Sequence, residues 1–131
     1  MGSASGAGPS GSDSAPASST CLRMPVGSSA AAELQARLPE ARVLKAFNTN
    51  FAATLASGTV GGAPTTVLVA GDDADAKAAL VAAVQAGGLK AVDAGSLARA
   101  HELEALGFLQ LTLAAAEKIT WSAVKRLTAV R

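Results

Sequence analysis

Short apolar runs alternate with helical patterns along this chain. Three apolar runs end in polar or glycine residues and predict strands over residues 42–47, 65–70 and 89–93. Apolar positions at helical spacing predict helices over residues 30–38, 51–56 and 72–86 and from residue 97 onward. A strand, a helix and a second strand of these lengths are typical of a parallel pair with a right-handed crossover. The pattern predicts an α/β fold with about three parallel strands, flanking helices and a carboxyl-terminal helical segment.

The amino-terminal residues differ from the rest in composition. They are mostly glycine, serine, alanine and proline, and Asp13 is their only acidic residue. Such a segment buries too little apolar surface to offset its ordering entropy. It has no basic start followed by an apolar run, so it does not resemble a signal peptide. We therefore expect a disordered tail over residues 1–25 and one folded unit over residues 26–131.

The net charge and the cysteine content argue against several kinds of partner and site. The 131 residues carry a net charge of +1, which gives no electrostatic case for nucleic acid or an anionic membrane. The single cysteine, Cys21, excludes an internal disulfide and a multi-cysteine metal site. The apolar run 106–116 is too short to span a bilayer and is interrupted by Gln110. We expect a cytoplasmic protein with no metal site and no nucleic-acid or membrane partner.

Asn48 and Thr49 follow the first predicted strand directly. In open sheets fed by helices, ligands bind outside the carboxyl ends of strands, which makes these side chains candidates for a binding site. The alternative is that one of them caps the helix that begins near Asn50, by accepting a free backbone N–H. Spacing alone favours the cap, and both interpretations remain open from the pattern.

Asp72 and Asp73 follow the second strand in the same way, and could be metal ligands or acid–base groups. Asp72 with Asp75 resembles a capping box, and this explanation needs fewer assumptions. No G-x-G-x-x-G sequence follows a predicted strand, and no phosphate loop or serine–histidine–aspartate set is visible. The residues alone therefore predict no catalytic group. The run 106–116 is apolar on nearly every side, which indicates burial against a partner.

Three motifs occur in a characteristic order: the run 42–49, the apolar strand entering Gly71-Asp72-Asp73, and the turn 93–97 followed by Arg99 and Glu102. In this order and spacing they resemble the NADPH-dependent reductases of the deazaflavin coenzyme F-420. The similarity spans roughly residues 22–127.

The resemblance implies a partial Rossmann-like domain, often dimeric, that works with NADP(H) and F-420 or a flavin-like cofactor. Phe47, Asn48 and Thr49 would lie beside the nicotinamide and the second ring as cofactor-binding residues. The turn 93–97 would support that cleft from the next strand. Hydride transfer requires two rings with their reacting carbons about 3–3.5 Å apart and no general base, so no catalytic residue is implied.

The resemblance also implies an amino-terminal half that carries the glycine-rich pyrophosphate turn. The glycines of residues 1–20 neither follow a strand nor open a helix, which is the context that phosphate binding requires. We therefore expect that half to be missing, the strand from Arg42 to have an uncovered edge, and the chain to be inactive alone.

Two hypotheses follow from this expectation. The chain is the carboxyl-terminal part of an NADPH-dependent oxidoreductase whose other half comes from another chain, or it is a non-catalytic remnant that serves as an oligomerisation or interaction module. Both hypotheses predict a homo-oligomer or an association with the missing half.

Overall fold

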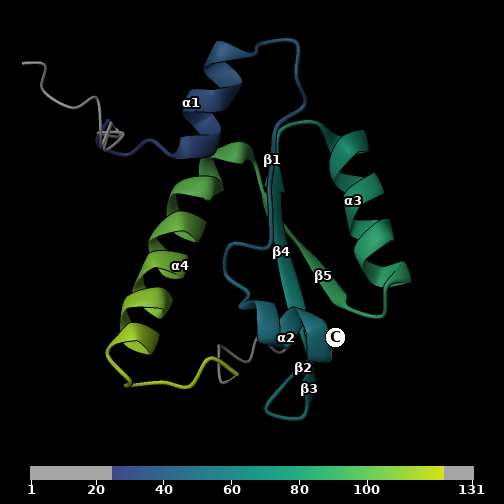
Figure 1. The fold of residues 1–131 in the computed structure, drawn as a ribbon. Coiled ribbons are helices and arrows are strands. Elements are labelled where there is room, and N and C mark those ends of the chain that lie inside the picture. Colours follow the sequence, from purple (N-terminus) through teal and green to yellow (C-terminus); the bar gives the residue numbers. More distant parts are fainter. Residues whose placement is uncertain (1–24, 123–131) are drawn as a thin grey trace, which may run out of the picture.

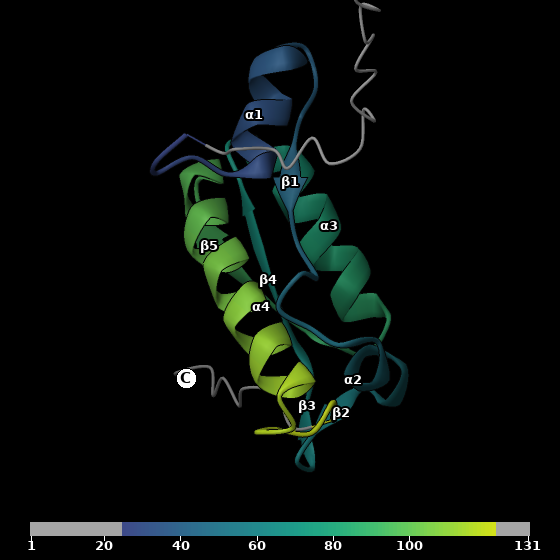
Figure 2. The same ribbon diagram turned by 60° about the vertical axis from the view of Figure 1, so that its left-hand side comes forward.

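The computed structural model describes residues 25–122 and contains a three-stranded sheet with helices on both faces. Helix α3 (Ala74–Ala86) covers one face, and α4 (Ala100–Ala115) covers the other, beside α1 (Ala30–Arg37) (Figure 1). Figure 2 shows the same separation from a second direction. The predicted α/β fold, with flanking helices and a carboxyl-terminal helix, is confirmed. The expected tail over residues 1–25 lies, apart from Pro25, outside the described residues.

The sheet has the order β1-β4-β5. Its strands are β1 (Leu44–Lys45), β4 (Thr66–Gly71) and β5 (Lys90–Gly95). Strands β4 and β5 run parallel, as the strand–helix–strand pattern predicts. The remaining elements are α2 (Ala52–Ser57), the hairpin of β2 (Thr59–Val60) and β3 (Ala63–Pro64), and the 3-10 helix η1 (Leu97–Arg99).

Strand β1 runs antiparallel to β4, with Leu44 opposite Gly71 and Lys45 opposite Ala70. The prediction of three parallel strands is therefore wrong for this strand. Helix α2 has only six residues, too few to carry the chain back along the sheet, so the chain enters β4 from the end of the sheet toward which β1 runs. Strand β1 lies beside the carboxyl end of β4, and the loop after it runs toward the start of β4, where Asn50 Nδ2 donates to Thr66 O at 3.0 Å.

Side-chain caps set the helix starts. Ser29 Oγ accepts a hydrogen bond of 3.0 Å from Ala32 N at the start of α1. Helix α3 is capped by Asp73, whose Oδ1 accepts from Ala76 N at 2.8 Å. The capping box expected at Asp72 is wrong, because Asp72 Oδ1 instead accepts from Leu97 N at 2.9 Å. Asp72 thus links the turn after β4 to the turn after β5.

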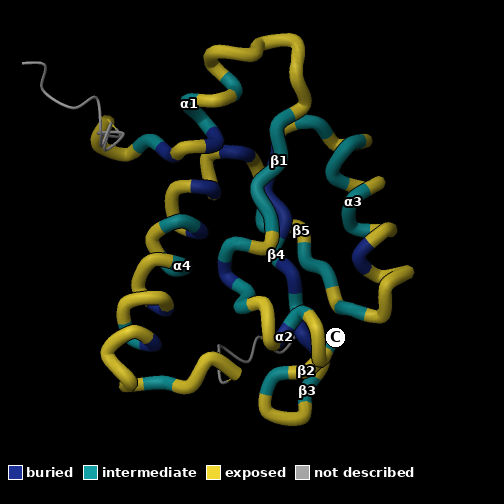
Figure 3. The backbone as a smooth tube through the Cα atoms, in the orientation of Figure 1, coloured by how far each residue is buried: buried dark blue, intermediate teal, exposed yellow. Residues whose placement is uncertain are grey.

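The core consists of two small clusters, one on each face of the sheet. On the α3 side the buried side chains are Val67, Val69 and Val84. On the side of α1 and α4 they are Ala31, Leu97 and Ala100. Figure 3 shows burial concentrated along β4, while much of α4 is exposed. Within residues 25–122 no helix has the length and apolar content needed to cross a membrane.

Candidate functional site

The loop after β1 turns sharply at Phe47, which has a φ of 65° in the left-handed region. A bulky side chain in this conformation costs roughly 1–2 kcal/mol, and such strain persists only where the surroundings enforce it. The turn is closed by Asn50 N, which donates to Phe47 O at 3.0 Å. The backbone of Phe47 is therefore fixed by its neighbours and not by its own preference.

Helix α4 supplies the contacts that fix this loop. The side-chain amide of Asn48 donates a hydrogen bond of 2.7 Å to the carbonyl oxygen of Leu103. One turn further along α4, a Cβ on Gly107 would lie 2.7 Å from Asn48 O and 2.9 Å from Asn48 Nδ2. Only a glycine permits this approach. Sequence reasoning missed Gly107, although an isolated glycine in a helical pattern is a signal of close packing.

The three predicted site residues occupy different environments. The Phe47 side chain is partly open to solvent, Asn48 is engaged with α4, and Thr49 is buried. The helix-capping alternative is wrong for Asn48 and Thr49, because the N-cap of α2 is Phe51 and it has no side-chain cap bond. None of the three predicted residues titrates near neutral pH, so the loop can offer packing and hydrogen bonding but no proton transfer.

An ion pair holds the same loop from the β1 side. Lys45 Nζ lies 3.1 Å from Glu104 Oε1 of α4. The Glu104 carboxylate also accepts hydrogen bonds from Ala30 N at 3.0 Å and Ala31 N at 3.4 Å, at the start of α1. Burial raises the pKa of Glu104, but the hydrogen bonds from Ala30 and Lys45 outweigh burial and hold the pKa below its usual range. Glu104 therefore joins β1, α1 and α4 through one carboxylate.

The turn 93–97 follows β5 at the carboxyl end of β4, the same end at which Lys45 of β1 lies opposite Ala70. Its expected support of a cleft beside Asn48 stays a prediction.

Lys77 of α3 contacts the backbone at the ends of both β4 and β5. Its Nζ donates to Gly71 O at 3.1 Å and to Gly95 O at 3.0 Å, and lies 2.9 Å from Asp93 Oδ1. The hydrogen bond from Lys77, followed by that from Gly95 N, lowers the pKa of Asp93.

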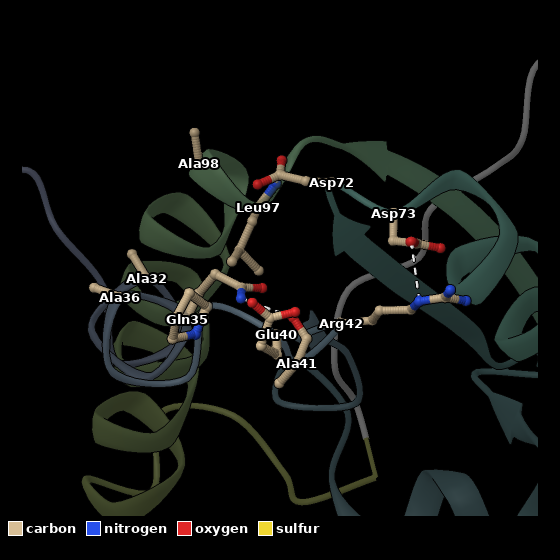
Figure 4. A pocket seen from close by; sticks show the side chains of 11 residues that line it. Ala32, Gln35, Ala36, Glu40, Ala41, Arg42, Asp72, Asp73, Leu97 and Ala98 are labelled. Atoms are coloured by element: carbon tan, nitrogen blue, oxygen red, sulfur yellow. Dashed lines mark hydrogen bonds and ion pairs between the residues drawn. The ribbon is translucent and has the colours of Figure 1, made fainter.

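An open cavity of about 940 Å³ lies at the carboxyl ends of β4 and β5, between α1, the segment 39–42 and the turns after these two strands (Figure 4). Arg42 Nε lies 3.3 Å from Asp73 Oδ2 at its rim. The lining also includes the carboxylates of Glu40 and Asp72. The cavity is thus lined by three carboxylates, those of Glu40, Asp72 and Asp73, and by one guanidinium, that of Arg42. This excess of negative charge disfavours binding of a phosphate group. Within the described part of the chain, no group of three histidine, cysteine or acidic residues could hold a metal ion.

The fold and the loop together define an α/β domain whose candidate site lies between the carboxyl end of β1 and helix α4. No protein-family model matches the sequence, and no curated protein matches it. A crystal structure from Arthrobacter sp. FB24, described as an F-420-dependent NADP reductase, is similar at a TM-score of 0.64 and 28% identity. The match covers 75% of this chain and 45% of that chain.

This match confirms the resemblance found in the motifs. The chain resembles the F-420-dependent NADP reductases and shares their Rossmann-like arrangement. At the level of class, it is similar to an oxidoreductase that uses NADP and F-420. It spans 45% of the length of that neighbour.

Proposed function

We propose that this chain forms one wall of the site of an NADPH-dependent oxidoreductase that transfers hydride between nicotinamide and a deazaflavin or flavin-like ring. Hydride transfer needs two rings held at short separation, and the protein contributes positioning and exclusion of water. A rigid loop without acid–base groups suits that task.

The observation that carries the proposal is the fixed loop itself. Phe47 is held in a strained conformation by the contact of Asn48 with Leu103 and Gly107. Strained backbone of this kind is concentrated at ligand sites, where it pre-organises the contact with the ligand. The similarity to an F-420-dependent NADP reductase supplies the chemistry. In this proposal Phe47, Asn48 and Thr49 bind the cofactor rings, and no side chain is catalytic.

The nucleotide-binding part of the proposed site comes from another polypeptide segment. Within residues 25–122, β1 is paired only with β4, so its second edge has no neighbouring strand. An uncovered strand edge is a template for pairing with a further strand. We propose that a strand of the nucleotide-binding half pairs with β1 and that the chain is inactive without it.

Activity in a reconstituted mixture tests the function. The chain is mixed with a separately produced nucleotide-binding half that carries a G-x-G-x-x-G turn. Deuterium at the transferable position of NADPH is then followed into F-420 by mass spectrometry. We expect label transfer in the mixture and none with either part alone. A mixture that binds neither NADPH nor F-420 and transfers no label contradicts the proposal.

The second candidate function is an interaction module, and a different observation supports it. Helix α4 has no charged side chain from Ala105 to its end at Ala115, and it exposes Phe108, Leu109 and Leu111. Such a surface fits a second copy of the chain. Light scattering of Leu109→Glu beside the wild type tests it, because a dimer built on this face should dissociate. A wild-type chain that is monomeric at all concentrations contradicts this candidate.

A further inference from the structure

The stretch after α4 returns to the candidate-site loop. Helix α4 ends at Ala115, and Figure 1 shows the chain then running back from the end of α4 toward α2. The indole ring of Trp121 packs there on the phenyl ring of Phe51, with ring centroids 4.9 Å apart and ring planes tilted by 56°. Aromatic rings at this separation and tilt attract each other. Phe51 is the N-cap of α2 and directly follows the loop 47–50.

A strained turn directs the chain into this contact. Glu117 has a φ of 56°, in the left-handed region that a glycine normally occupies at the end of a helix. Two hydrogen bonds hold the turn: Glu117 N donates to Ala114 O at 3.0 Å, and Lys118 N donates to Leu113 O at 2.9 Å. A residue with a Cβ keeps this conformation only where its surroundings enforce it. The reversal of the chain after α4 is therefore fixed, and it determines where the indole ring lies.

The loop 47–50 is consequently held at three places. The first is α4, where the side chain of Asn48 donates a hydrogen bond of 2.7 Å to a backbone carbonyl. The second is the start of β4, where the side chain of Asn50 donates a hydrogen bond of 3.0 Å. The third is the ring pair at Phe51. Of these contacts the ring pair is open to solvent, because the relative exposure of Trp121 is 50%.

We propose that Trp121 is a positioning residue of the candidate site, which keeps the loop 47–50 in its strained conformation by holding Phe51. The left-handed conformation of Phe47 is costly, so it persists only while both ends of the loop are held. An exposed contact opens at a lower free energy than a buried one, so the loop is released first at the ring pair. The inference rests on the proposed function for its effect on hydride transfer, whereas its effect on the loop requires no cofactor.

Amide hydrogen exchange of the full chain tests this role. The amide of Asn50 is the reporter, because its hydrogen bond to Phe47 O closes the turn of the loop. The amide of Leu38 at the end of α1 is the reference for a local opening elsewhere, since α1 and α2 lie at opposite ends of the sheet (Figure 1). We expect Trp121→Ala to speed exchange at Asn50 by about two to ten times, the range that one aromatic pair accounts for, and to leave exchange at Leu38 unchanged.

Three further variants make the comparison specific. Phe51→Ala removes the other ring of the pair, so adding Trp121→Ala to it should have no further effect on exchange at Asn50. Trp121→Phe keeps an aromatic ring and should exchange at the wild-type rate. Phe108→Ala is the matched control, because it removes from α4 an exposed ring that belongs to no aromatic pair within the described residues.

Two other measurements follow the contact and its consequence. Trp121 is the single tryptophan of the chain, so its fluorescence reports the contact directly. Phe51→Ala should make the indole more accessible to quenching by acrylamide. In the reconstituted mixture, Trp121→Ala should lower the rate of label transfer from NADPH, and Trp121→Phe should retain it.

Four results would overturn the role of Trp121. In the first, Trp121→Ala leaves exchange at Asn50 unchanged while the slowest amides of β4 exchange faster, as expected of a contribution to global stability alone. The others are equal exchange in Trp121→Ala and Phe108→Ala, equal quenching in the wild type and Phe51→Ala, and label transfer that Trp121→Ala does not slow. A wild type that transfers no label would contradict the proposed function, and exchange at Asn50 would still decide the role of Trp121.

Discussion

Asn48 and Gly107 are in backbone contact, so that a Cβ at position 107 would lie 2.7 Å from the carbonyl oxygen of Asn48. This contact brings the loop after β1 against the middle of α4. It joins two segments far apart in the sequence, and the candidate site depends on it.

Gly107→Ala should destabilise the protein. Alanine is favoured over glycine in a helix by about 1 kcal/mol, but a backbone clash of this kind costs roughly 1–3 kcal/mol, so the clash outweighs the helix propensity. Chemical denaturation measures the difference. Ala105→Gly is the control, because it reports helix propensity at an exposed position of α4. The opposite result is that Gly107→Ala raises the free energy of unfolding by the same amount by which Ala105→Gly lowers it. In that case only helix propensity acts at position 107, and the close contact with Asn48 does not affect stability.

Phe47→Gly should be more stable than Phe47→Ala. Both variants remove the ring, but only glycine adopts a φ of 65° without strain. We expect a difference of roughly 1 kcal/mol in the free energy of unfolding in favour of glycine. Equal stabilities would mean that the loop relaxes out of the left-handed conformation when the ring is removed.

Lys77→Met should destabilise the protein, because Lys77 links the carboxyl ends of β4 and β5. The methionine keeps most of the apolar stem but leaves the carbonyl groups of Gly71 and Gly95 without their donor. Loss of these bonds should cost about 1–3 kcal/mol. Lys90→Met is the control, since Lys90 lies exposed on β5. Thermal unfolding that changes equally in the two variants would contradict the bridging role of Lys77.

Glu104→Gln should destabilise the protein in a pH-dependent way. The pKa of Glu104 is lower in the folded protein than its ordinary value of 4.5. The charged carboxylate therefore stabilises the fold fully above about pH 4.5, and this contribution is lost as the pH falls through the lowered pKa. We expect a loss of about 1 kcal/mol at neutral pH, the size of a helix cap, and little difference in strong acid.

Thermal unfolding of the Glu104→Gln variant across this pH range measures the effect. Glu102→Gln is the matched control, because the pair of Glu102 with Arg99 is exposed on both sides and contributes little. A deficit of Glu104→Gln that stays constant from neutral pH to strong acid would contradict the assigned role of the carboxylate.

The sequence by itself determined the order of the three sheet strands and the four α-helices, and the parallel pair of β4 and β5. These features depend on local periodicity and on a connection long enough to cross the sheet. The motif order also indicated the reductase resemblance, which the solved neighbour confirms.

Only the tertiary structure decided what surrounds the stretch from Lys45 to Thr49. The direction of β1 depends on a short helix and a hairpin that return the chain to the same end of the sheet, and no local pattern encodes that reversal. The strain at Phe47 and the approach of Asn48 to Gly107 arise from packing between segments more than fifty residues apart. Contacts at that separation are fixed by the fold as a whole, which is why spacing alone favoured a helix cap.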